Sequence, residues 1–125
     1  MTIDQLFDLL TQATPSFDRV RRAHVEAYQE VLPHLLVSEL LAFIESRFSG
    51  VLWAEVEAPN MDEIRALFEV LEAGLEQGDD YTVDAIAVSF VEGIDGSPHY
   101  AELRPFFGPI MCQTLAAQQN WKPAY

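Results

Sequence analysis

The sequence predicts a single all-α domain over residues 1–125, with six or seven helices stacked as antiparallel hairpins. Three observations support this prediction. The chain has the size of one domain and half of its residues are hydrophobic, so it can bury a core. Apolar residues recur with helical spacing along most of it. Helix-breaking Pro and Gly residues separate these runs near residues 15, 33, 50, 78 and 96.

The first two helices are predicted from capping residues and apolar spacing. Thr2 followed by Gln5 is a capping box for a helix over residues 3–12. Ser16 is the expected N-cap of a second helix over residues 17–32. The inner stripe of this second helix is expected to comprise Phe17, Val20, Ala23 or His24, Ala27, Tyr28 and Val31.

A third helix is expected after Pro33, because proline suits the first turn of a helix. It covers residues 34–48 and ends at Ser49-Gly50. Residues 51–59 leave three conformations open, since they fit a helical continuation, a short strand or a surface loop. Trp53 in this segment is either a core residue, which is the favoured interpretation, or an exposed anchor.

The central feature of the chain is a predicted helical hairpin from Asn60 to Ile94. Asn60 and Glu63 form a capping box, and Gly78 is expected to end the first helix in the left-handed conformation. The inner stripe of this helix is Ile64, Leu67, Phe68, Leu71 and Leu75. The second helix, residues 80–94, is apolar nearly all round and is therefore expected to be buried. A strand over residues 82–91 is the alternative, because this run is rich in β-branched residues.

The C-terminal part is predicted to continue in helices. Residues 95–98 form a turn, residues 100–104 form a helical turn, and Pro109 begins a last helix that ends near Gln119. Cys112 in this helix is expected to be a buried structural thiol, and the apolar tail 121–125 is expected to pack on the body.

The charge of the chain limits its partners. Twenty acids stand against seven bases, for a net charge of −13. Residues 55–102 hold thirteen acids and one base, which gives this segment a charge of −12. Such a field repels nucleic acid and anionic membranes, and it attracts a basic partner. The alternative is that the acidity only confers solubility. No apolar run is long enough to cross a membrane, and residues 1–10 lack a signal peptide, so a cytoplasmic protein is expected.

The motifs of common active sites do not occur in the sequence. There is no Gly-rich phosphate loop and no sequence signature of a metalloprotease or serine hydrolase. The three histidines are scattered and expected at or near the surface, and one cysteine cannot build a metal cluster or an internal disulfide. We therefore predict no enzyme, no metal and no cofactor. A carboxylate-based enzyme stays the weakest of three alternatives, because no nucleophile, base and orienting group can be placed together.

Two motifs of the C-terminal half carry a resemblance. GDDYTVDAIAVSFVE (residues 78–92) followed by LRPFFGP (residues 103–109) resembles a family of small acidic bacterial proteins. In that family a Gly-Asp turn precedes a hydrophobic segment ending in Glu, and an L-x-P-x-(Leu/Phe)-G-P element follows. Its members resemble immunity proteins encoded beside polymorphic toxins. The resemblance implies an α-helical protein that binds and blocks a cognate toxin, and it carries over no binding residue.

These observations together predict an immunity protein that covers the basic active-site cleft of a cognate toxin domain with an acidic helical surface. The residues expected to bind the partner are Glu69, Glu72, Glu76, Asp79, Asp80, Tyr81, Asp84, Asp95 and Trp53. The acids would steer the encounter, and the aromatic residues would supply buried contact area. The alternative is a non-catalytic structural or adaptor protein, and a homodimer is one form of this alternative.

Overall fold

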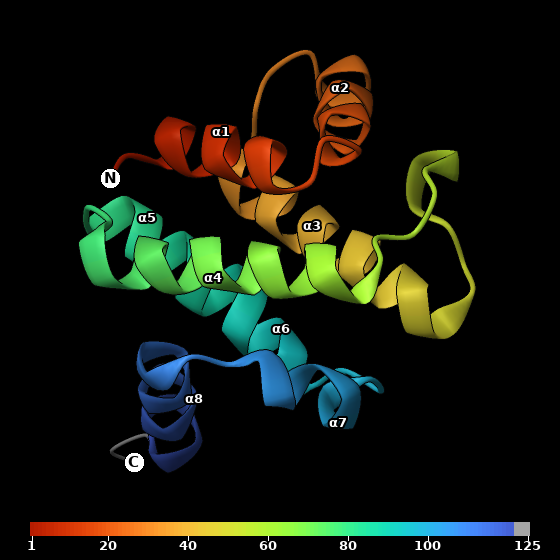
Figure 1. Ribbon diagram of the computed structural model, residues 1–125. Helices are drawn as coiled ribbons and strands as arrows, with labels where there is room; N and C mark the ends of the chain where they lie inside the picture. The colour runs from red at the N-terminus through yellow and green to blue at the C-terminus, as the bar shows by residue number, and fades with distance from the viewer. Residues whose placement is uncertain (122–125) are drawn as a thin grey trace.

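The computed structural model describes residues 1–121, and every regular element in this part of the chain is helical (Figure 1). The α-helices are α1 Ile3–Ala13, α2 Phe17–Tyr28, α3 Pro33–Ser49, α4 Met61–Gln77, α5 Asp80–Ile86, α6 Glu92–Asp95, α7 Tyr100–Leu103 and α8 Pro109–Asn120. Two 3-10 turns cover Trp53–Glu55 and Arg104–Phe106. A π-helical segment, Ala87–Val91, joins α5 to α6 without a break. With α5 to α6 counted as one helix, residues 1–121 hold seven, which confirms the all-α prediction.

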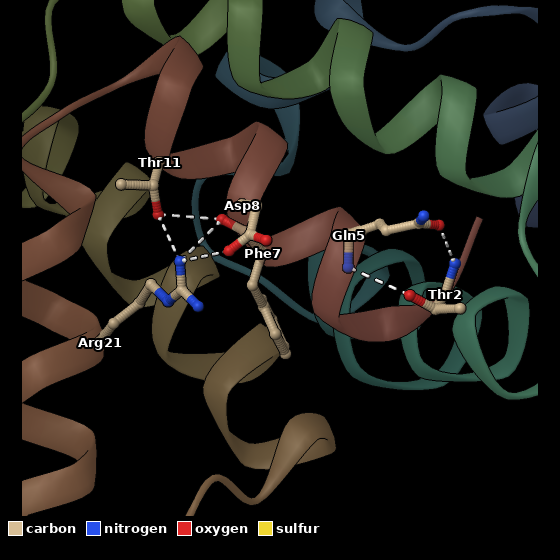
Figure 2. A network of polar contacts seen from close by, with 6 residues as sticks. All are labelled: Thr2, Gln5, Phe7, Asp8, Thr11 and Arg21. Atoms are coloured by element: carbon tan, nitrogen blue, oxygen red, sulfur yellow. Dashed lines mark hydrogen bonds and ion pairs between the residues drawn. The ribbon is translucent and has the colours of Figure 1, made fainter.

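The first helix begins as the sequence predicts and is tied to the second. The Thr2 hydroxyl accepts from the Gln5 N–H at 3.2 Å, and the Gln5 side chain accepts from the Thr2 N–H at 2.8 Å (Figure 2). Arg21 of α2 reaches back to α1, where one guanidinium nitrogen contacts three oxygen acceptors (Figure 2). These are the Phe7 carbonyl at 3.3 Å, the Asp8 carboxylate at 3.3 Å and the Thr11 hydroxyl at 3.0 Å.

Helix α2 begins at Phe17, directly after Ser16, as predicted, but it ends earlier than predicted. Ser16 has helical backbone angles (φ −64°, ψ −19°), and its side chain forms no capping hydrogen bond. The helix ends at Tyr28 and not at Leu32, and the C-cap residue Gln29 is left-handed with φ 62°. Leu32 precedes Pro33 and is extended, because the proline ring disfavours a helical conformation in the residue before it. Three positions of the expected inner stripe are therefore exposed: Ala27, Tyr28 and Val31.

His24 is buried, although all three histidines were expected at or near the surface. Its Nδ1 lies 2.5 Å from a carboxylate oxygen of Glu39 on α3, and its Nε2 accepts from the Leu32 N–H at 2.9 Å. A nitrogen that accepts from an N–H carries no proton, so the imidazole is neutral and donates to Glu39 through Nδ1. This pair joins α2, the α2–α3 connection and α3.

Helix α4 confirms the predicted capping box and inner stripe. Asn60 and Glu63 exchange hydrogen bonds of 2.8 and 3.0 Å, and all five residues of the stripe are buried. The prediction of a left-handed Gly78 is wrong, since its backbone is extended (φ −70°, ψ 153°). A glycine is still needed there, because a Cβ would lie 2.3 Å from the Gly74 carbonyl oxygen. The next residue, Asp79, already caps α5.

The continuous helix from α5 to α6 occupies the centre of the domain, so the strand alternative for residues 82–91 is wrong. Phe68 of α4 packs on Phe90 of this helix with ring centroids 5.3 Å apart, and on Phe106 at 5.4 Å. Helix α4 therefore connects the central helix with the C-terminal part of the chain.

Helix α3 lies beside the central helix and runs in the same direction. Near its start, His34 Nδ1 lies 2.9 Å from Ser89 Oγ. Near its end, the Glu45 carboxylate accepts from the Ser97 hydroxyl. These two contacts place α3 alongside the central helix over most of the length of α3.

Residues 51–59 form an irregular surface segment, and the core interpretation of Trp53 is wrong. The Trp53 side chain is 36% exposed, and Val56 is the buried apolar residue instead. Ala54 and Glu55 both adopt left-handed angles (φ 50° and 58°), a conformation that costs roughly 1–2 kcal/mol for each residue with a Cβ.

The last helix starts at Pro109 as expected. Cys112 is half-buried, not fully buried, and its sulfur accepts from the Arg104 guanidinium at 3.2 Å. Trp121 is 71% exposed, and the rest of the predicted apolar tail, residues 122–125, lies outside the described residues.

Candidate partner-binding surface

The residues expected to bind a partner lie on different elements, and the structure does not gather them all at one place. Glu69 and Glu76 are exposed on α4, which crosses the front of the molecule in Figure 1. Tyr81 and Asp84 lie on α5 and contact His34 of α3, and both of these helices pass behind α4 in the same view.

Glu72 of the predicted acidic stripe makes an internal contact. Its carboxylate accepts from the backbone N–H groups of Ile110 at 2.5 Å and Met111 at 3.1 Å, in the first turn of α8. A carboxylate is favourable there because the helix N-terminus presents unpaired N–H groups and a partial positive charge. Gly108 leaves the space it needs, since a Cβ on this residue would lie 2.4 Å from the Glu72 carboxyl carbon. The Gly-Pro end of the LRPFFGP motif is thus explained by packing.

Two further predicted acids also have partners within the chain. Asp79 caps α5 by accepting from the Thr82 N–H at 2.8 Å. The neighbouring Thr82 hydroxyl and the hydrogen bond from the Thr82 N–H hold the pKa of Asp79 below its usual value. Asp95 accepts from the Gln119 amide of α8 at 2.9 Å.

The outer side of the central helix presents a mixed apolar and acidic surface, which we call the α5 patch. It consists of Tyr81, Asp84 and Val88 with His34 and Ser89 beside them. Tyr81 is 48% exposed and Val88 is 46% exposed, although both belong to a mostly apolar segment. Their spacing of i, i+3 and i+7 places Tyr81, Asp84 and Val88 on one side of the helix. Asp80, one turn before Asp84, is exposed as well.

His34 and Ser89 are the members of the α5 patch that the sequence did not reveal. His34 Nδ1 lies 2.9 Å from Ser89 Oγ, and its Nε2 lies 3.6 Å from a carboxylate oxygen of Asp84. The Tyr81 ring meets the imidazole edge-on, with ring centroids 5.5 Å apart. His34 and Ser89 are 55 residues apart, and no spacing motif links them. Only the packing of α3 along the central helix brings them together.

Ser89, His34 and Asp84 lie in a row and have the residue types of a hydrolytic triad, but their geometry departs from that of a triad. The distance from His34 to Asp84 exceeds that of a hydrogen bond. Ser89 lies within a continuous helix, where backbone N–H groups bond to preceding carbonyls, as that of Glu92 does to Ala87. A tetrahedral intermediate at Ser89 would need N–H donors directed at it. The π-helical segment around Ser89 is nevertheless of a kind often found at functional sites.

The electrostatic surroundings of these surfaces are acidic. Arg65, the one base between residues 55 and 102, pairs with Asp62 at 3.0 Å. Within residues 1–121, no group of three or more His, Cys, Asp or Glu side chains is arranged to hold a metal ion. None of the described helices combines the length and apolar character needed to span a bilayer.

Trp53 lies apart from the α5 patch. It is near the C-terminal end of α3, where it borders a shallow hollow together with Glu45 and His99. His34 lies at the opposite end of the same helix. The two exposed aromatic residues that were expected to act as anchors therefore belong to separate surfaces.

The fold and the α5 patch define a small all-helical domain with an acidic surface that carries exposed aromatic and aliphatic residues. The chain belongs to the family described as Domain of unknown function (DUF7674), whose profile matches residues 7–122. No curated protein and no solved structure matches the chain.

Proposed function

We propose that this chain is a non-catalytic binding protein that docks on a basic protein through the α5 patch. The observation that carries the proposal is the exposure of Tyr81 and Val88 on either side of Asp84. The Tyr81 ring is a side chain of the kind that dominates binding hot spots, Val88 adds apolar contact area, and the Asp84 carboxylate can pair with a basic residue.

The charge of the chain supports a basic partner. The acids of residues 55–102 create a negative field, and exposed members of it lie on α4 and α5. Such a field accelerates the encounter with a positively charged surface and orients it before contact. Self-association, the alternative, would bring together two chains of net charge −13, which is electrostatically unfavourable.

The specific form that we propose is an immunity protein that neutralises a cognate toxin. The resemblance of residues 78–92 and 103–109 to immunity-like proteins supports this form. Toxin domains that act on nucleic acids or nucleotides need a basic cleft, because their substrates carry phosphate charges. An acidic surface with a protruding tyrosine is suited to cover such a cleft.

Two variants and one matched control test the α5 patch, by their affinities for a basic protein that the native chain retains from an extract of the organism that encodes it. Tyr81→Ala should weaken binding by about 30-fold, as expected of a buried aromatic hot spot. Asp84→Asn should weaken it by about tenfold and reduce its dependence on salt. The control Glu30→Gln removes one exposed acid after α2 and should change affinity by less than about twofold. Equal affinities for all three variants would rule out the α5 patch as the docking surface.

A further inference from the structure

A second surface feature lies between the end of α3, the 51–53 segment and the residues before α7. It is a hollow of about 220 Å³. Its lining residues are Ala42, Glu45, Ser49, Val51, Leu52, Trp53, Pro98 and His99. Most of the lining is apolar, and neither Lys nor Arg contributes to it. Val51 and Leu52 beside it are 74% and 52% exposed, so apolar surface is open to solvent here.

One carboxyl group borders the hollow. Glu45 is half-buried on α3, and the Ser97 hydroxyl donates to its Oε2. Among the described residues, no donor contacts its Oε1 and no Lys, Arg or His forms an ion pair with it. A partly desolvated carboxylate of this kind is a favourable acceptor for a cationic group.

We propose that this hollow receives an arginine side chain of a partner polypeptide. The guanidinium would donate to Glu45 and stack on the Trp53 indole, and its aliphatic stem would lie against Leu52 and Pro98. Arginine fits better than lysine because its planar group can stack on an aromatic face and bond a carboxylate at the same time. This contact is independent of the α5 patch.

The backbone of the same segment supports a recognition role. Ala54 and Glu55 directly follow Trp53, and both hold left-handed angles that residues with a Cβ rarely adopt. Strain of this kind concentrates at binding sites, where the surrounding structure maintains it. Here the strained residues lie between Trp53 and the buried Val56, which holds the segment on the body.

The test uses Trp53 as its own reporter in a chain that carries Trp121→Phe. The probes are N-acetyl-arginine amide, its neutral isostere N-acetyl-citrulline amide, and N-acetyl-lysine amide, at constant ionic strength. We expect the arginine probe to change Trp53 fluorescence with a dissociation constant on the order of 1–10 mM, as suits a small ligand in an open hollow. The citrulline probe should bind at least about tenfold more weakly, because it lacks the charge.

Two variants locate the binding. Glu45→Gln keeps an acceptor for Ser97 and should weaken the arginine probe about tenfold. Glu57→Gln is the matched control. It removes one acid of the 51–59 segment that does not line the hollow, and it should leave binding unchanged. The proposal is overturned if arginine and citrulline bind equally, if lysine binds as tightly as arginine, or if Glu45→Gln has no larger effect than Glu57→Gln. None of these outcomes bears on the α5 patch.

Discussion

Glu72 gives the sharpest stability prediction, because sequence places it on an exposed acidic stripe and the structure places it on the N-terminus of α8. Its carboxylate accepts from the Ile110 and Met111 N–H groups. Glu72→Gln removes the charge and leaves one neutral acceptor. The lost capping and charge-dipole interactions amount to about 2 kcal/mol for a half-buried site. This corresponds to a fall in melting temperature of about 6–10 °C.

The control is Glu69→Gln, which removes an exposed acid one turn earlier on the same helix. It should change stability by less than about 0.5 kcal/mol. Both variants are compared with the native chain by urea denaturation. Gly108→Ala should be destabilising too, because its methyl group displaces the Glu72 carboxylate. The double variant with Glu72→Gln should lose less than the sum of the two. Equal stabilities of Glu72→Gln and Glu69→Gln, or strict additivity, would refute the assignment of Glu72 as the cap of α8.

Three further predictions concern single sites. Thr82 lowers the pKa of Asp79 in the folded chain. Ionised Asp79 therefore stabilises the fold at pH values above 3.8, which is the usual pKa of this side chain. This contribution is lost as the pH falls through the folded pKa. The stability gap between the native chain and Asp79→Asn, measured by denaturation over a pH series, should therefore narrow with acid; a constant gap would contradict this. Ala54→Gly should raise stability by about 0.5–1 kcal/mol in thermal denaturation, because glycine accepts φ 50° without strain, and a loss would refute the strain. Glu39→Ala leaves buried His24 without its acceptor and should cost about 2–4 kcal/mol in urea denaturation, whereas a cost below about 1 kcal/mol would contradict the pairing.

The elements that sequence predicts well depend on local patterns. The capping boxes at Thr2 and Asn60, the apolar stripe of α4 and the proline at the start of α3 each act within one or two turns. A pattern within one helix is enough to define them. The capping box is an example, because both of its partners lie within four residues.

The features that sequence misses depend on contacts between distant residues. Glu72 has the spacing of a solvent-facing acid, and only the position of α8 gives it a partner 38 residues away. His24 is buried because Glu39 approaches it from another helix. In the 51–59 segment the buried apolar residue is Val56 and not Trp53.

The α5 patch likewise combines residues that the sequence indicates with residues that only the packing reveals. The sequence singles out Asp84, a carboxylate on an apolar helix, together with the nearby Tyr81. Ser89 interrupts the same apolar run, but no pattern within the helix assigns it to a surface, and His34 lies in a different helix. Both join the patch through the packing of α3 on the central helix. Sequence also assigns Asp79 and Asp95 to a partner surface, whereas both accept hydrogen bonds within the chain.

The central claim, that the α5 patch binds a basic protein, is tested most directly by capture from an extract of the organism that encodes the chain. Native chain, the double variant Tyr81→Ala/Asp84→Asn and the control Glu30→Gln are each immobilised at about 50 mM and about 500 mM salt, a range that screens exposed charges. We expect the native chain and the control to retain one basic protein stoichiometrically at low salt and less of it at high salt, and the double variant to lose it. Equal capture by the double variant, or recovery of the chain alone at both salts, would contradict the claim.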